Sequence, residues 1–186
     1  QNPAEYSTCI LAAAIRERFK GPVFILGDHF QINRNAYIQD PLKELTAIEE
    51  LIRESINAGF FNIDIDASTL VDTSKSDLEE QQENNCLITA LMTHFIRKNE
   101  PKDVTISIGG EIGEIGAGNS TVEELRTFMS GYLNRLLPNT QPISKVSVQT
   151  GTVHGGVVLP DGSIARVTPD LQALKDLSAV AREEYG

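Results

Sequence analysis

Five side chains that could bind a metal ion or move a proton follow four strand-like runs in this sequence. The runs are Pro22–Gly27, Phe61–Ile65, Val104–Gly110 and Lys145–Thr150, and the side chains after them are Asp28, His29, Asp66, Glu111 and His154. In a parallel α/β protein the carboxyl ends of the strands meet at one edge of the sheet. We therefore expect these five side chains to form one polar site, which favours an enzyme.

The two strand-end histidines are the best candidate metal ligands. Neutral imidazole suits zinc, and a catalytic zinc site needs three protein ligands and one open position. His154 lies among glycines, which allow close approach of the backbone to a ligand. A third histidine, His94, falls inside a helix-patterned segment, so we expect it on a helix face. A turn with an incidental histidine would explain Asp28-His29 alone, but the matching position of His154 favours a functional role.

Two strand-end carboxylates could complete such a site. Strand alternation places Asp66 on the same side of its strand as Asp64. Glu111 lies in a glycine-rich segment that also contains Glu114. A flexible loop with solvated carboxylates would explain Glu114, whereas the position of Glu111 at a strand end favours a functional role.

Between the strand-like runs the sequence has the periodicity of helices. Helix-capping residues and apolar positions at helical spacing predict helices over about Tyr6–Phe19, Asp40–Gly59, Ser76–Lys98, Ser120–Leu137 and from Thr168 onward. The segment Phe30–Gln39 is polar and is predicted to be a loop. Four strand-then-helix units with right-handed crossovers give a parallel sheet, and the short, branched strands are typical of burial on both faces.

The length of the chain limits the choice of α/β fold. A complete TIM (β/α)8 barrel takes ~250 residues, and this chain has 186. We expect a single domain over residues 1–186 that supplies about four βα units, the central part of such a barrel, truncated at both ends. A small, complete, doubly wound open sheet is the alternative.

Composition and charge limit the classes of binding partner that this protein could have. The formal net charge of -10 argues against a nucleic-acid backbone or an anionic membrane surface as partner. No apolar run approaches the ~20 residues that span a bilayer. Cys9 and Cys86 lie in helix-patterned segments, so we expect buried, reduced thiols in a cytoplasmic protein.

At the strand-end residues the chain resembles the zinc-dependent class II ketose-bisphosphate aldolases. Four segments carry the resemblance from end to end: Gly27-Asp28-His29, Ile65-Asp66-Ala67-Ser68, Glu111-Ile112-Gly113 and Gly151-Thr152-Val153-His154-Gly155. The last of these is the most specific. The family's third zinc histidine and its phosphate-binding residues have no counterpart in this sequence, and the segment from Glu114 to Asn119 departs from the family pattern.

The resemblance implies a reaction and a role for each site residue. It implies aldol cleavage and condensation of a ketose bisphosphate to dihydroxyacetone phosphate and an aldehyde, a lyase reaction of carbohydrate metabolism such as glycolysis. Asp28 would be the catalytic acid/base, and His29 and His154 would be two of three zinc ligands. Asp66 and Glu111 would hold a second divalent or monovalent cation.

The resemblance also implies partners. The backbone of Gly155 would contact the phosphorylated sugar, and the protein would assemble as a homodimer or homotetramer. The run from Asp28 to Asn33 also resembles the non-catalytic subunits of tagatose-bisphosphate aldolase, so a stabilising subunit is the alternative. Retention of His154 favours the catalyst.

Overall fold

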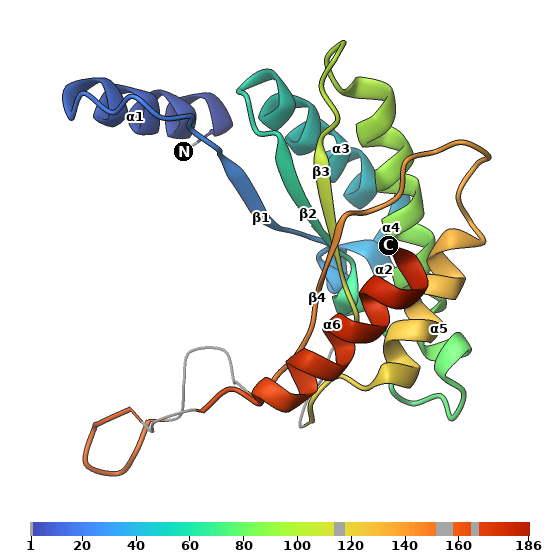
Figure 1. Cartoon of the computed structure of the whole chain (residues 1–186). Helices are drawn as coiled ribbons and strands as arrows, with labels where there is room; N and C mark the ends of the chain where they lie inside the picture. Colours follow the sequence, from blue (N-terminus) through green and yellow to red (C-terminus); the bar gives the residue numbers. More distant parts are fainter. Residues whose placement is uncertain (1, 114–117, 152–157, 165–167) are drawn as a thin grey trace.

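The computed structural model describes residues 2–113, 118–151, 158–164 and 168–186, and within these ranges it is an α/β protein (Figure 1). The elements are α1 (Pro3–Arg16), β1 (Leu26–Gln31), α2 (Arg34–Gln39), α3 (Pro41–Asn57), β2 (Asn62–Asp66), the short 3-10 helix η1 (Ser68–Leu70), α4 (Leu78–Asn99), β3 (Ser107–Glu111), α5 (Val122–Leu133), β4 (Lys145–Ser147) and α6 (Leu171–Tyr185). Among the described helices, none has the length and apolar character that crossing a bilayer requires.

The four strands form one parallel sheet in the order β1-β2-β3-β4. Each strand pairs with the next one along the chain, so the order nowhere reverses. Helices α3 to α6 lie along one face of this sheet, while α1 lies by the amino ends of the strands (Figure 1). A doubly wound sheet reverses its strand order and carries helices on both faces. The described sheet has neither feature.

The hydrophobic core fills the space between this face of the sheet and the helices. Ile63 of β2 and Ile108 of β3 are neighbours in the strand register and are fully buried. Helix α4 presents Met92 and Ile96 to the same layer, and Phe128 of α5 closes it. Burying each such side chain contributes on the order of 2 kcal/mol, so this layer holds the sheet and helices together.

The opposite face of the sheet is polar, which corrects the expectation of strands buried in apolar surroundings on both sides. Asn62, Asp64 and Asp66 alternate with the buried isoleucines of β2, and Ser107 and Glu111 do the same in β3. No described helix covers this face (Figure 1). The alternation of isoleucine with acidic and amide residues therefore reflects a strand with one face in the core and one facing a polar space.

Several predicted boundaries were wrong because a neighbouring residue makes the better cap. Asp77 caps α4 instead of Ser76, accepting hydrogen bonds from two backbone N–H groups. Thr121 forms the capping box of α5 with Glu124, because the hydroxyl of Ser120 accepts a hydrogen bond from the backbone of Gln149.

Other boundaries moved for similar reasons. Asp170 caps α6, so this helix begins at Leu171 and not at Thr168. The segment predicted as a loop contains α2, which is capped by the side chain of Asn33. The predicted cap of α3 at Asp40 is confirmed.

The two thiols differ in environment. Both cysteines are free; Cys86 is buried between α4 and α5, as predicted, but Cys9 is exposed on α1. Helix α1 buries only Ser7, because it contacts little besides α3 and the ring of Phe60. Its apolar positions therefore give helical periodicity without burial.

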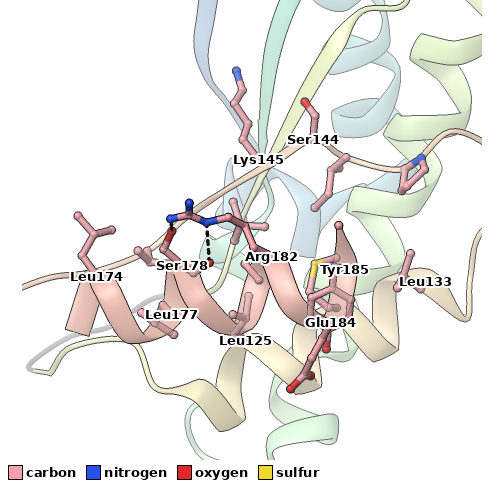
Figure 2. Close-up of a pocket in the computed structure, with 17 residues that line it drawn as sticks. Leu125, Leu133, Ser144, Lys145, Leu174, Leu177, Ser178, Arg182, Glu184 and Tyr185 are labelled. Atoms are coloured by element: carbon pink, nitrogen blue, oxygen red, sulfur yellow. Dashed lines mark hydrogen bonds between the residues drawn. The ribbon is translucent and has the colours of Figure 1, made fainter. Parts of the chain in front are cut away.

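An apolar groove of about 460 Å³ runs between α5, β4 and α6 (Figure 2). Leu125, Ile143 and Leu177 are among the side chains that line it. At its rim, Arg126 of α5 forms an ion pair with Glu184 of α6 in which both carboxylate oxygens accept from the guanidinium. Of the predicted site residues that the structure describes, Asp28, His29, Asp66 and Glu111, none lines this groove.

Candidate metal centre

A bulge in β1 places His29. The pairing of β1 with β2 shifts register between Gly27 and Phe30, so Asp28 and His29 lie inside the strand and not after it as predicted. His29 has a φ of 52°, in the left-handed region that few non-glycine residues adopt. The bulge turns its imidazole toward the carboxyl end of β2.

The carboxylate of Asp66, the last residue of β2, makes four polar contacts. Its Oδ1 accepts hydrogen bonds from the backbone N–H (3.1 Å) and the hydroxyl (2.6 Å) of Ser68. Its Oδ2 lies 2.6 Å from the donating Nε2 of Gln31 and 3.0 Å from Nδ1 of His29. The side chain is almost fully buried. Asp66 is therefore a fixed carboxylate whose orientation its neighbours determine.

Glu111, the last residue of β3, completes the group. Its Oε2 lies 3.4 Å from Nδ1 of His29. Its backbone carbonyl accepts a hydrogen bond of 2.8 Å from the buried amide of Asn85, and the next carbonyl, of Ile112, is 3.4 Å from Nε2 of Gln82. Helix α4 thus anchors the strand end from the core side, leaving the Glu111 carboxylate to face His29.

The ligand atoms of His29, Asp66 and Glu111 all lie within 4.8 Å of one another. One imidazole nitrogen and two carboxylate oxygens are ligands that Zn²⁺ and other divalent cations accept. The side chains of His29 and Glu111 are partly exposed, so an ion can reach them. The residues fit a divalent cation.

The protonation of the three groups reflects this crowding. The hydrogen bond to Asp66 raises the pKa of His29 above 6.5, against partial burial, with help from the Glu111 carboxylate. Burial, together with the charge of Asp66, raises the pKa of Glu111 to about 7. Burial also acts to raise the pKa of Asp66, but the hydrogen bonds from Ser68, Gln31 and His29 outweigh it and lower the pKa. A cation would replace the proton that this group shares.

The structure brings together three of the six predicted site residues. Asp28 is exposed beside them, and its charge helps to raise the pKa of both His29 and Glu111. His154 and Gly155 lie outside the described residues, as does Glu114. His94 lies on α4 as predicted, with Nε2 3.4 Å from the carbonyl oxygen of Arg135.

Sequence reasoning missed the residues that orient the ligands. Asp66-Ala67-Ser68 has the spacing of a turn in which an aspartate accepts from the residue two positions later, so Ser68 could have been found. Gln31 reaches Asp66 because of the bulge in β1, and no pattern in the sequence predicts this bulge. Asn85 lies 26 residues before Glu111 in the middle of a helix, and no local signal connects them.

Comparison with known proteins gives a relationship of fold. No protein-family model matches the sequence, and no curated protein matches it. Among solved structures, the crystal structure of a probable tagatose 6 phosphate kinase from Sinorhizobium meliloti 1021 is similar to this chain, with a TM-score of 0.68 and 16% sequence identity. The match covers 99% of this chain and 45% of that chain, so the chain spans less than half of that protein's length. The likeness is one of fold alone.

Proposed function

We propose that this chain supplies four βα units of a (β/α)8 barrel that catalyses metal-dependent aldol cleavage of a ketose bisphosphate. One observation carries the proposal: Asp66 and Glu111 end the adjacent parallel strands β2 and β3, His29 comes from the bulge in the neighbouring β1, and their ligand atoms meet within 4.8 Å. Active sites of barrel enzymes lie at this end of the strands. The sequential strand order, the helices on one face and the polar opposite face support the barrel.

The chain's own residues would hold the ion and move protons. His29, Asp66 and Glu111 would bind a divalent cation, with His154 of the glycine-flanked motif as a further ligand. A bound zinc ion supplies Lewis-acid polarisation of a ketose carbonyl. Asp28, exposed beside the group, would accept the proton of the hydroxyl at which the carbon–carbon bond breaks, and return it in the condensation direction.

A phosphorylated ketose fits the charge of this site only with a cation. The chain carries a net charge of -10, and Asp28, Asp66 and Glu111 all lie at or beside the centre. A bound divalent ion would offset these carboxylates and permit an anionic substrate to approach. The name of the structural neighbour also concerns a phosphorylated ketohexose, tagatose 6-phosphate, although its reaction is of another class.

The test is an assay of aldol cleavage with matched variants. The full-length protein, loaded with Zn²⁺, is supplied separately with fructose and tagatose 1,6-bisphosphate, and dihydroxyacetone phosphate is measured. We expect cleavage that a chelator abolishes and Zn²⁺ restores, and that His154→Ala and His29→Ala lack, while His94→Ala retains it. Full activity after chelation, or ATP-dependent phosphorylation of tagatose 6-phosphate in place of cleavage, would overturn the proposal.

One observation favours a second candidate, a non-catalytic subunit that stabilises an aldolase partner. Both oxygens of Asp66 already accept hydrogen bonds, from Ser68 and from Gln31, as those of a structural carboxylate do. A stabilising subunit would show no cation-dependent cleavage of its own. It would instead prolong the half-life of the activity of an aldolase mixed with it, equally well with and without His29→Ala.

A further inference from the structure

A second charged group lies on the polar face of the sheet, two residues before the metal centre along the strands. Asp64 of β2, Gly109 of β3 and Lys145 of β4 are partners in the strand register and form a row across three strands. Lys145 Nζ lies 2.7 Å from Asp64 Oδ1. Figure 2 shows Lys145 extending from β4 away from α6, toward the polar face.

Glycine at the middle of this row makes the ion pair possible. A Cβ at position 109 would collide with the carboxylate of Asp64 and would lie 3.1 Å from Cε of Lys145. The two side chains therefore meet over the bare backbone of β3. Among the described residues, the ammonium of Lys145 is the group that meets this buried Oδ1.

The row is close enough to act electrostatically on the centre above it. Asp64 lies two residues before Asp66, about 7 Å along the strand, and Gly109 lies two residues before Glu111. Asp64 therefore places a negative charge close to the Asp66 and Glu111 carboxylates. The ammonium of Lys145 neutralises the charge of Asp64 locally, so the ion pair adds little net charge near the metal centre.

We propose that the Asp64–Lys145 ion pair sets the charge beneath the metal centre and that Lys145, as a positioning residue, limits its affinity for divalent cations. The inference rests on cation binding by His29, Asp66 and Glu111, and not on aldolase activity. Removal of Lys145 leaves an uncompensated carboxylate under the ion and strengthens binding. Removal of the Asp64 charge leaves an uncompensated ammonium and weakens it.

Opposite signs distinguish this role from a purely structural one. If the pair served only to hold β2 and β4 in place, loss of either partner would weaken cation binding in the same direction. Charge balance instead predicts tighter binding in Lys145→Met, weaker binding in Asp64→Asn, and near-native binding in the double variant. At a separation of about 7 to 10 Å in partly solvated surroundings, a unit charge changes the affinity for a divalent ion roughly tenfold.

The experiment is a Co²⁺ titration of the full-length protein at pH 8, followed by visible absorption and by calorimetry. The variants are Lys145→Met, Lys145→Gln, Asp64→Asn and Asp64→Asn with Lys145→Met. Lys98→Met makes the same change of charge at an exposed position of α4 and is the matched control. Thermal unfolding in chelator confirms that each variant is folded, and Lys145→Gln replaces Lys145→Met if the latter is not.

The expected result is a dissociation constant about tenfold lower for the Lys145 variant, about tenfold higher for Asp64→Asn, and within about threefold of wild type for the double variant and for Lys98→Met. Weaker binding in both single variants, or no change in either, would overturn the inference. Absence of Co²⁺ binding in the wild type would overturn it together with the metal centre. Co²⁺ binding with opposite shifts, but without cleavage of a ketose bisphosphate, would support this inference while the proposed function fails.

Discussion

The two faces of the sheet are built from alternate residues of the same strands, yet they differ in burial, in polarity and in the side chains that pack on them. Ile63 is completely buried against the helices, while its neighbour Asp64 faces the polar side and pairs with Lys145. Gly109 and Gly110 show the same division within β3. Side chains from the polar face crowd the first glycine, and core side chains from α4 and α5 crowd the second.

This difference separates stability from chemistry. The helix-covered face removes apolar surface from water, which stabilises the fold. The polar face assembles carboxylates whose mutual repulsion opposes folding unless protons, cations or an ammonium balance them. The faces should therefore respond differently to substitution, to pH and to metal ions.

The largest effect on stability is expected from the helix-covered face. Ile63→Ala removes a fully buried side chain and leaves a cavity, so we expect the free energy of unfolding to fall by about 3 kcal/mol. Leu42→Ala, at a position of α3 where the side chain is 77% exposed, should change it by less than about 0.5 kcal/mol. Urea denaturation measures both, and equal losses would contradict the described burial.

On the polar face, His29→Ala is expected to change cation binding more than stability. His29 supplies the nitrogen ligand of the centre, so the dissociation constant for Co²⁺ should rise by at least ~100-fold, given that even residues outside the ligand shell are worth about 10- to 100-fold. His94→Ala on α4 is the control and should leave binding unchanged. Retention of binding in His29→Ala would show that the three residues do not form the ion site.

The adjacent glycines of β3 offer the sharpest test of the comparison. In Gly110→Ala the new methyl lies 3.2 Å from the ring of Phe128 and 3.3 Å from Ile143, within packed core, so we expect a loss of about 1–3 kcal/mol. In Gly109→Ala it meets the ends of the Asp64 and Lys145 side chains, which can turn away, and about 1 kcal/mol or less is expected. Thermal unfolding in chelator compares the stability of the two variants. A larger loss in Gly109→Ala than in Gly110→Ala would contradict the assignment of Gly110 to the core face and Gly109 to the polar face.

The smallest effect concerns pH and the metal-free protein. Folding raises the pKa of Glu111 from 4.5 to about 7, so the folded state binds more protons between these values and stability falls as pH rises. His29, whose pKa is also raised, stabilises the fold below pH 6.5 and loses this contribution as pH rises through its folded pKa. The lowered pKa of Asp66 acts in the opposite sense but only in acid.

From pH 5.5 to pH 8, the metal-free protein should therefore lose on the order of 1 kcal/mol, after solvent screening of the partly exposed Glu111 is allowed for. Glu111→Gln should flatten the profile, whereas Glu83→Gln, on the exposed side of α4, should not. Added Zn²⁺ should reverse the trend, because the ion competes with protons for the same ligands. A profile that rises with pH without metal would contradict the raised pKa of Glu111.

Much of the fold could be predicted because it depends on local pattern. The alternation of isoleucine with polar residues marks β2, and the apolar spacing with Asp40 and Pro41 marks α3. The parallel sheet follows from the alternation of strands and helices. Exact helix starts were missed where two adjacent polar residues compete to cap, as with Ser120 and Thr121, since the contact of Ser120 with Gln149 decides between them.

The candidate site could be predicted in residue type more than in geometry. The sequence pattern grouped Asp66, Glu111 and His29, and the structure places their ligand atoms within 4.8 Å of one another. The sequence did not reveal that a bulge would put His29 within the strand in a left-handed conformation, because the pairing register depends on β2. The Asp64–Lys145 pair depends on a register across three strands, which a single sequence does not encode locally.

The burial of Cys86 under α5 gives the protein a built-in chemical reporter. Its Sγ donates to the carbonyl of Phe128 at 3.4 Å, burial raises its pKa to about 11, and a Cβ at Gly131 would lie only 2.8 Å away. A thiol so protonated and enclosed reacts with an alkylating reagent only when α4 and α5 separate. Cys9 on α1 is exposed and reacts without such opening. The ratio of the two labelling rates in the unmodified protein therefore measures how often the helix layer opens, and whether a bound cation slows it.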